Sequence, residues 1–248
     1  MPQSAMDVTL NSEYQKCLVV GLPGTGKSVF ASTFPTPGYV FDFSLGIQIY
    51  RGLPWDYEQF PLSPAGWNKF DKELAYVKNA VKERKYETVV IDDCTAMERV
   101  TMEQALLLNP KRSEAQGPIW NVHYSLVRNL FEGKIRQVID LPCNVVLLAH
   151  MEIITDKESG AVLKIQPSLP GQLPDILNGY FDEVYYATTR QESGGTKFLL
   201  QTVPIGHNRA RSRWSGKARL LPDFIDNDYP ALMNAMKKKQ QQLKTGGK

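Results

Sequence analysis

A short segment near the N-terminus carries glycines, a lysine and a serine at the spacing that binds phosphate groups. Residues 21–28 read GLPGTGKS and fit the pattern G-x-x-x-x-G-K-[ST] at every fixed position. Glycines let backbone N–H groups turn inward around phosphate oxygens, while Lys27 can reach the β and γ phosphates and the Ser28 hydroxyl can ligate Mg²⁺. The segment therefore predicts binding of a nucleoside triphosphate with Mg²⁺. The residues expected to contact the nucleotide are Leu22, Pro23, Gly24, Thr25, Gly26, Lys27, Ser28 and Val29.

A nucleotide-hydrolysing site also needs a carboxylate that holds Mg²⁺ through its water shell. Asp92 follows the apolar run 88–91 and is the candidate for this role, with a capping or turn acid as the alternative. The next residue, Asp93, could polarise the attacking water, or it could cap a helix that starts near Thr95. Two acids at the end of a buried parallel strand are therefore predicted at the active edge of a sheet.

Two further polar residues end apolar runs that should form parallel strands. Asp42 lies in the run 39–43 and is expected at the carboxyl edge of the sheet, near the phosphate loop. His150 ends the run 144–149 and is expected at the same edge, where it could sense the γ-phosphate or an attacking water. A structural role is the alternative for His150. The sequence places His123 on the surface of a helix.

Basic residues are concentrated in one segment of the C-terminal part, between residues 207 and 222. This cluster contains no Asp or Glu and consists of Arg209, Arg211, Arg213, Lys217 and Arg219. It could form a solvated face, a DNA-binding stripe, or fingers that reach the nucleotide of a neighbouring subunit. An arginine supplied in trans would stabilise the charge that builds on the transferred phosphoryl group. Trp214 in this segment is expected to anchor a hairpin rather than to stack on a base.

These residues require an α/β framework to bring them together. Apolar runs at 17–20, 39–43, 88–93 and 144–149 predict buried strands, and the segment 27–33 can be helical. Apolar residues at steps of three and four predict helices over 64–81 and 124–138. After residue 151 the pattern changes to two hairpins, whose turns lie at 156–160 and 192–195. A short helix is expected at 230–237, followed by a low-complexity end.

Composition limits the function classes. The 248 residues are 42% hydrophobic and carry a net charge of only +3, which fits one sizeable α/β core and gives no global electrostatic case for nucleic-acid binding. The three cysteines form no C-x-x-C pair and are expected to be reduced, partly buried thiols. Because no apolar stretch is long enough to span a bilayer and no signal pattern is present, the sequence predicts a soluble, intracellular protein without a membrane partner.

With these features in order, the chain resembles the RecA-like P-loop ATPases, and specifically the phage Sak-type single-strand annealing ATPases. The resemblance runs from about residue 16 to 222. Besides the phosphate loop, it rests on the strand at 89–93, the strand at 145–150, and the segments LPGQLP (169–174), YFDEVYY (180–186) and RARSR (209–213). It implies a RecA-like P-loop NTPase core of the α/β class, with a mostly parallel sheet, helices on both faces and C-terminal β-hairpin additions.

The resemblance also implies a domain plan and partners. Residues 1–15 would form an N-terminal extension, 16–222 the ATPase domain, and 223–248 a short helix with a basic flexible tail. The protein would bind single-stranded DNA as a homo-oligomer, a ring or a filament with ATP between subunits, and a single-stranded DNA-binding protein is a further candidate partner. A phage origin would place it in the cytoplasm of the bacterial host. The candidate DNA contacts are Lys111, Arg112, Lys157 and Lys164.

One departure from the family pattern bears on hydrolysis. RecA-like enzymes commonly place a catalytic glutamate just after the second strand, and residues 42–46 here read DFSLG, without a glutamate. Either Asp42 or Asp93 takes over, or hydrolysis is slow and the nucleotide acts mainly as an assembly switch. The leading hypothesis is an ATP-dependent DNA recombination or annealing protein. A small-molecule kinase and a nucleotide-switched scaffold with little hydrolysis are the alternatives.

Overall fold

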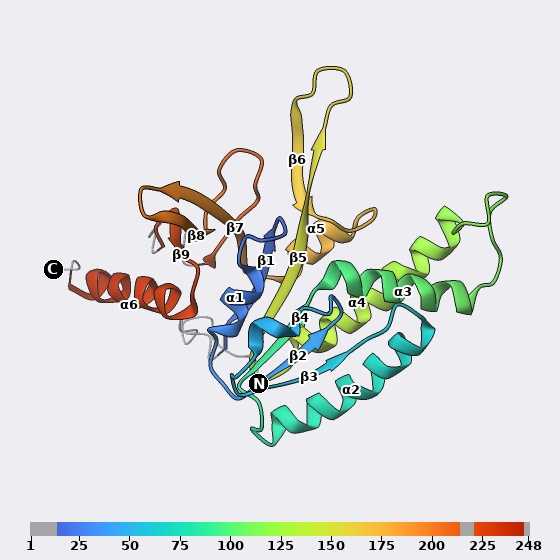
Figure 1. The fold of residues 1–248 in the computed structure, drawn as a ribbon, viewed down its shortest axis with the longest axis horizontal. Coiled ribbons are helices and arrows are strands. Elements are labelled where there is room, and N and C mark those ends of the chain that lie inside the picture. The colour runs from blue at the N-terminus through green and yellow to red at the C-terminus, as the bar shows by residue number, and fades with distance from the viewer. Residues whose placement is uncertain (1–13, 214–220, 246–248) are drawn as a thin grey trace, which may run out of the picture.

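A computed structural model describes residues 14–213 and 221–245 of the chain (Figure 1). The strands are β1 (Lys16–Gly21), β2 (Gly38–Asp42), β3 (Trp55–Gln59), β4 (Thr88–Asp92), β5 (Asn144–Thr155), β6 (Val162–Pro167), β7 (Glu183–Glu192), β8 (Gly195–Gln201) and β9 (Phe224–Asp226). The helices are α1 (Lys27–Ser32), α2 (Pro64–Lys82), α3 (Cys94–Leu108), α4 (Ser125–Ile139), α5 (Leu173–Tyr180) and α6 (Tyr229–Thr245), with a 3₁₀ turn η2 (Ile47–Tyr50) and a π turn η3 (Trp120–Tyr124).

The strands form one mixed sheet in the order β3-β2-β4-β5-β1-β7-β8-β9, and β6 pairs with β5 beside this path. The β1–β5, β1–β7, β2–β3, β2–β4 and β4–β5 pairs are parallel. The β5–β6, β7–β8 and β8–β9 pairs are antiparallel. In this register Gly21 lies beside His150, and Asp42 lies beside Asp92. The predicted RecA-like α/β fold, with a mostly parallel sheet and β-hairpin additions, is therefore confirmed.

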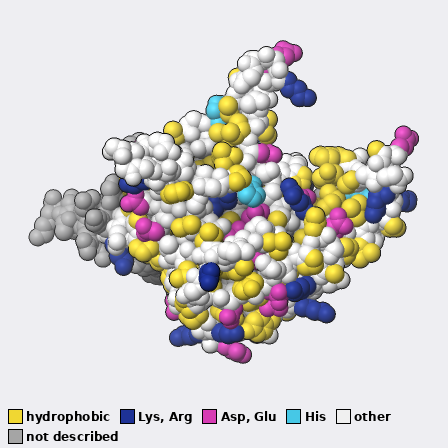
Figure 2. Space-filling view, in the orientation of Figure 1, with side chains coloured by type: hydrophobic (Ala, Val, Ile, Leu, Met, Phe, Trp, Pro, Cys, Tyr) yellow, Lys and Arg dark blue, Asp and Glu magenta, His cyan; other side chains and the backbone are white. Residues whose placement is uncertain are grey.

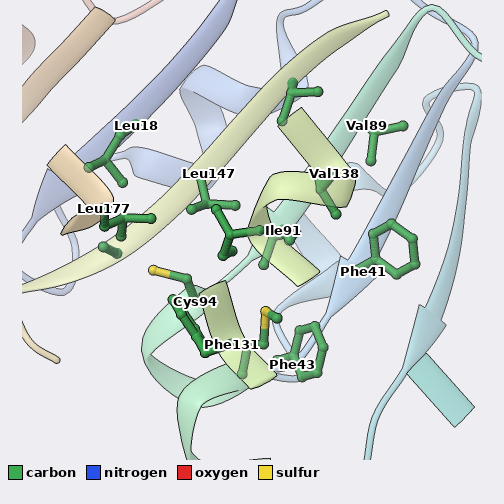
Figure 3. Close-up of a cluster of buried hydrophobic side chains, with 14 of the residues drawn as sticks. Leu18, Phe41, Phe43, Val89, Ile91, Cys94, Phe131, Val138, Leu147 and Leu177 are labelled. Atoms are coloured by element: carbon green, nitrogen blue, oxygen red, sulfur yellow. The ribbon is translucent and has the colours of Figure 1, made fainter. Parts of the chain in front are cut away.

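Hydrophobic cores on the two faces of the sheet explain why the central strands are continuously apolar. In β1, Leu18 and Val20 face one core, while Cys17 and Val19 face the other, and all four are fully buried. Helices α2, α3, α4 and α5 cover the first core, where side chains of four neighbouring strands meet those of the helices (Figure 3). Helices α1 and α6 cover the second core. The sheet thus holds the carboxyl ends of β1 and β4 at one edge, together with the part of β5 at His150.

The amphipathic helix predicted at 64–81 is confirmed as α2. Pro64 stands at its first turn, where a missing N–H costs nothing. The predicted apolar stripe is buried, and its members are Trp67, Phe70, Leu74, Val77 and Val81. The three cysteines are free thiols and buried, as expected.

Some elements differ from the sequence-based expectation. Strand β3, helix α5 and strand β9 were not predicted, because each is short and none carries a long periodic pattern. The C-terminal helix, expected over 230–237, continues to Thr245 as α6. Lysine, glutamine and leucine are good helix formers, so a low-complexity composition does not prevent helix continuation.

The expected surface position of His123 is wrong. Its side chain is fully buried, in the π turn before α4. The N–H of Ile119 donates to His123 Nδ1 at 2.8 Å, and His123 Nε2 donates to the carbonyl oxygen of Asn109, also at 2.8 Å. The imidazole therefore joins the two ends of the polar loop between α3 and α4. Helical periodicity failed here because the π turn changes which residues share a face.

In Figure 1 the β5–β6 hairpin projects well beyond the sheet. On the face shown in Figure 2, lysine and arginine side chains are scattered among acidic ones and form no continuous basic patch. Among residues 14–213 and 221–245, no helix is both long and apolar enough to cross a membrane.

Candidate nucleotide site

The phosphate loop has the strand, loop and helix context that the sequence predicted. It leaves the end of β1, and α1 begins at Lys27. Gly24 and Gly26 have φ angles of 79° and 84°, in the left-handed region that glycine adopts without a steric penalty. At Gly21, an added Cβ would lie 2.6 Å from Thr25 Oγ1 and 2.9 Å from the Ala187 carbonyl oxygen, so this position has no room for a side chain. All three glycines are thus required by the loop itself.

Lys27 is held inside the loop by the loop's own carbonyl groups. The side chain is only 8% exposed, and Nζ donates to the carbonyl oxygens of Gly21 and Leu22, each at 3.0 Å. Burial lowers the pKa of Lys27, while the nearby carboxylates of Asp93 and Asp92 act in the opposite direction. From this position the ammonium group can release the two carbonyl oxygens and bind phosphate oxygens instead, without a large movement of the side chain.

Asp92 lies opposite the phosphate loop, at the end of β4. Its Oδ1 accepts a hydrogen bond from Ser44 Oγ at 3.3 Å, and its Oδ2 is buried with no partner among the described residues. Burial raises the pKa of this carboxyl to about 6; the Asp93 and Asp42 carboxylates also raise it, whereas hydrogen bonding from Ser28 and Ser44 favours the charged form. The arrangement therefore combines a costly buried charge with a carboxylate oxygen that no group in the described parts of the chain satisfies.

This donor set fits Mg²⁺. The Ser28 hydroxyl and Oδ2 of Asp92 are hard oxygen ligands on facing elements, and an unpartnered buried carboxylate oxygen is what a cation would satisfy. Within the described parts of the chain, no group of three or more His, Cys, Asp or Glu residues could hold a metal alone. The residues thus suit an ion that completes its shell with phosphate oxygens and water.

Asp93 and His150 form a pair beside the phosphate loop. His150 Nε2 lies 3.0 Å from Asp93 Oδ2, and the other carboxylate oxygen, Oδ1, accepts the N–H of Ala96 at 2.7 Å. Asp93 therefore caps α3, which was one of its two predicted roles. The backbone N–H of His150 donates to Thr95 Oγ1 at 3.2 Å, and His150 Nδ1 is buried without a partner in the described structure. The sheet thus brings His150 to the predicted edge and fixes its ring through Asp93.

Asp42 is also at this edge, but its oxygens are engaged. The side chain is fully buried; Oδ1 accepts the N–H of Gly46 at 3.0 Å, and Oδ2 accepts from Gln59 Nε2 at 2.9 Å. The carboxylate therefore holds the segment after β2 and the end of β3. A catalytic role for Asp42 would require one of these bonds to open, and that role stays a prediction.

The basic cluster makes contacts within its own chain. Arg211 donates through Nε to the carbonyl oxygen of Phe181 at 3.0 Å and through Nη2 to that of Asn178 at 2.6 Å, which satisfies carbonyl groups at the end of α5. Arg213 Nη2 lies 2.8 Å from an oxygen of Asp182. Its Nε lies 3.3 Å from Glu183. A role in a neighbouring subunit would need these contacts to be exchanged. Trp214, Lys217 and Arg219 lie outside the described residues.

The four candidate DNA contacts lie in two places. Lys111 and Arg112 are exposed in the loop after α3, where Arg112 Nη2 donates to the carbonyl oxygen of Leu106 at 3.3 Å. Lys157 is exposed in the turn of the β5–β6 hairpin. Lys164, on β6, pairs with Asp175 at 3.2 Å. The structure therefore leaves Lys157 exposed to solvent, whereas Asp175 partly neutralises Lys164.

Two residues of the site were missed by sequence reasoning. Ser44 donates to Asp92, and its position two residues after β2 was a signal that could have identified it. Asn227 donates through Nδ2 to the Gly26 carbonyl oxygen at 2.8 Å, and no sequence pattern predicts a contact between residues 201 positions apart.

Comparison with known proteins identifies the family. A family described as an AAA domain matches residues 13–214, most of the 248-residue chain. The chain belongs to the AAA domain family. As an AAA domain protein with an intact phosphate loop, it is an ATPase. The KaiC-like protein PH0186 from Pyrococcus horikoshii OT3 is a similar solved structure, with 15% identity and a TM-score of 0.45 over 80% of this chain and 82% of that one. No curated protein matches the chain.

Proposed function

We propose that this AAA domain protein is a DNA recombination ATPase of the single-strand annealing type, which binds single-stranded DNA as an oligomer. The observation that carries the proposal is the path of β5. This strand begins in the core, passes the phosphate loop at His150, and continues without interruption to Thr155 in the projecting hairpin (Figure 1). A change at the γ-phosphate can therefore move a segment that lies far outside the nucleotide site.

Within this proposal, His150 and the hairpin have separate tasks. His150 senses the γ-phosphate, with its ring oriented by Asp93. The exposed Lys157 contacts DNA phosphates, and Lys164, Lys111 and Arg112 extend that contact. Because the net charge is small and the basic side chains are scattered, binding would depend on these few local contacts, and its salt dependence would be correspondingly shallow (Figure 2).

The nucleotide chemistry follows from the same residues. ATP would occupy the phosphate loop, Ser28 and Asp92 would hold Mg²⁺, and that ion would neutralise the charge on the β and γ phosphates. In this proposal Asp93, through His150, would orient an attacking water and so replace the glutamate missing after β2. The resemblance to phage annealing ATPases would place the protein in the cytoplasm of a bacterial host, where a single-stranded DNA-binding protein is a further candidate partner.

A combined measurement of ATP hydrolysis and particle mass, with and without single-stranded DNA, tests the proposed function. We expect DNA to raise the hydrolysis rate and to shift the protein to a larger assembly in the presence of ATP and Mg²⁺. The hydrolysis-deficient scaffold is the second candidate, since both oxygens of Asp42 are engaged. ATP-dependent assembly without phosphate release would favour that scaffold. Phosphoryl transfer to a small acceptor, with no response to DNA, would favour a kinase instead.

The proposed trans role of the arginines makes a separate prediction. Arg213→Ala should lower hydrolysis by about 10³-fold while ATP affinity stays nearly unchanged, because the guanidinium would act on a neighbour's transition state. Mixing it with Lys27→Ala should restore hydrolysis, since an intact Arg213 would then face an intact phosphate loop at some interfaces. A folding defect would not be restored by mixing. Arg209→Ala, which removes a pair with Asp175 at 2.7 Å, is the matched control.

Arg211, the other candidate finger, donates to carbonyl groups at the end of α5. Arg211→Ala is therefore expected to lower the melting temperature of the protein, because those carbonyl groups lose their donor. If mixing Arg213→Ala with Lys27→Ala gives no more hydrolysis than either variant alone, the finger assignment for Arg213 is wrong. Arg211 would then be tested in the same mixed assay.

A further inference from the structure

We infer that Phe198 is the surface on which the base of the bound nucleotide stacks, and that Asn227 positions it. This inference rests on the proposed nucleotide site and adds the part of that site that recognises the nucleoside. The observations that carry it are the direction of the triphosphate, the contact between Phe198 and the phosphate loop, and the attachment of β9 to that loop.

The strand order fixes the direction of the triphosphate. Asp92, at the end of β4, and His150, within β5 beside Gly21, would face the γ-phosphate and its metal, and both strands lie on one side of β1. On the other side of β1 lie β7, β8 and β9. An extended triphosphate whose γ end lies near β4 and β5 therefore directs its nucleoside toward β7, β8 and β9.

Phe198 presents an aromatic side chain at this place. It lies on β8 and is 42% exposed, and an added Cβ on Gly26 would lie 3.1 Å from its Cδ1 atom. The ring thus lies directly against the phosphate loop. Two positions along the same strand face, Leu200 is fully buried in the core beneath α1. Phe198 continues this apolar face outward, to the point where a base would meet solvent.

Asn227 connects the phosphate loop to the strand beside Phe198. The side chain is only 8% exposed, and Nδ2 donates to the Gly26 carbonyl oxygen. Its Oδ1 is buried and has no partner among the described residues. Strand β9 pairs with β8 next to Phe198, through the Leu199–Asp226 register. The hydrogen bond from the buried Asn227 amide to Gly26 keeps β8 and β9 at a fixed position relative to the loop.

The start of α6 strengthens this attachment. The N–H of Tyr229 donates to Thr33 Oγ1 at 2.8 Å, and the rings of Tyr229 and Phe34 lie 4.4 Å apart. Helix α1 is therefore held at its first residues through Asn227 and just past its end through Tyr229. Phe198 thus stands on a framework that is fixed to the phosphate loop before any nucleotide arrives, which lowers the entropic cost of stacking.

Stacking on an aromatic face tolerates any base, because every base has a π face. Phe198→Leu and Phe198→Ala should therefore weaken ATP and GTP binding alike, by about tenfold. Binding of inorganic tripolyphosphate with Mg²⁺ should not change, because it has no base. Phe198→Tyr should bind nucleotides like the unmodified protein. Tyr57→Ala, which removes an aromatic side chain that is 51% exposed on β3 at the far edge, is the matched control.

Calorimetric titration of each variant with ATP, GTP and tripolyphosphate separates the outcomes. An unchanged ATP affinity in Phe198→Leu would overturn the stacking role. An equal loss for ATP and tripolyphosphate would also overturn it, since the change would then act on the phosphate loop. If the unmodified protein binds neither ATP nor tripolyphosphate, the nucleotide site itself is wrong and this inference fails with it. Asn227→Asp, which cannot donate to the Gly26 carbonyl, should weaken all three ligands.

Discussion

Lys27→Ala is expected to reduce ATP affinity by about 100-fold, because it removes charge-assisted hydrogen bonds to the β and γ phosphates. In the structure, Nζ of Lys27 donates to two carbonyl groups of the phosphate loop, which hold the ammonium within the loop. Calorimetric titration with ATP and Mg²⁺ measures the effect. Hydrolysis should become undetectable at ATP concentrations that saturate the unmodified protein.

Two controls make this result specific to Lys27. Lys72→Ala removes the same charge from the exposed surface of α2 and should bind ATP normally. Lys27→Arg keeps the charge but carries a larger planar group, which does not fit between the Gly21 and Leu22 carbonyl groups as an ammonium does. Affinity within twofold of the unmodified protein for Lys27→Ala would mean that the nucleotide does not bind at this loop.

Asp92→Asn is expected to change activity and stability in opposite directions. Hydrolysis should fall by about 100-fold or more, since the proposed Mg²⁺ site would lose the carboxylate of Asp92. Stability should rise, because burial raises the pKa of Asp92 to about 6 and makes its ionised form costly. A carboxyl whose pKa is higher in the folded than in the unfolded state binds protons better when folded, so stability is lost as the pH rises through that range.

The size and the pH dependence of the stability change can be measured by denaturant unfolding without nucleotide. At pH 8 the variant should be more stable by on the order of 1–3 kcal/mol, and the difference should vanish below about pH 4, where both states carry a protonated Asp92. Asp93→Asn is the matched control. It keeps a side-chain oxygen that can cap α3 but loses the carboxylate that faces His150, so it should not stabilise the protein as Asp92→Asn does. Equal shifts in the two variants would contradict the assigned environments.

The sequence was sufficient for the central part of the fold because burial on both faces leaves a clear pattern. Strands such as β4 and the core half of β5 are uninterrupted runs of valine, isoleucine and leucine, and their ends place Asp92 and His150 at one edge. The phosphate loop was equally clear, because each of its glycines answers a backbone requirement. The phosphate loop, Asp92 and His150 could therefore be predicted to lie together from their positions along parallel strands alone, without knowledge of their side-chain contacts.

The remaining features depend on contacts that no local pattern records. Strand β3, with the sequence WDYEQ, is an edge strand with mixed burial, and its alternation is too short to be distinctive. The engagement of Asp42 by Gln59, and of Arg213 by Asp182 and Glu183, changes what those charged groups are free to do. Sequence gives the identity and the strand position of a charged residue, but its partners come from tertiary packing.

The bond between Asn227 and Gly26 also affects the order in which the protein can form. Strand β1 leaves the ribosome early, yet its parallel partners β5 and β7 come much later, and Asn227 follows Gly26 by 201 residues. At a synthesis rate of 5–20 residues per second, roughly 10–40 s pass between the two. During the first part of that time the glycine loop lacks its neighbouring strands β5 and β7, and until the end of it the loop lacks its C-terminal attachment. Nascent chains that stop before residue 227 should therefore fail to retain nucleotide, although they already contain every residue of the phosphate loop.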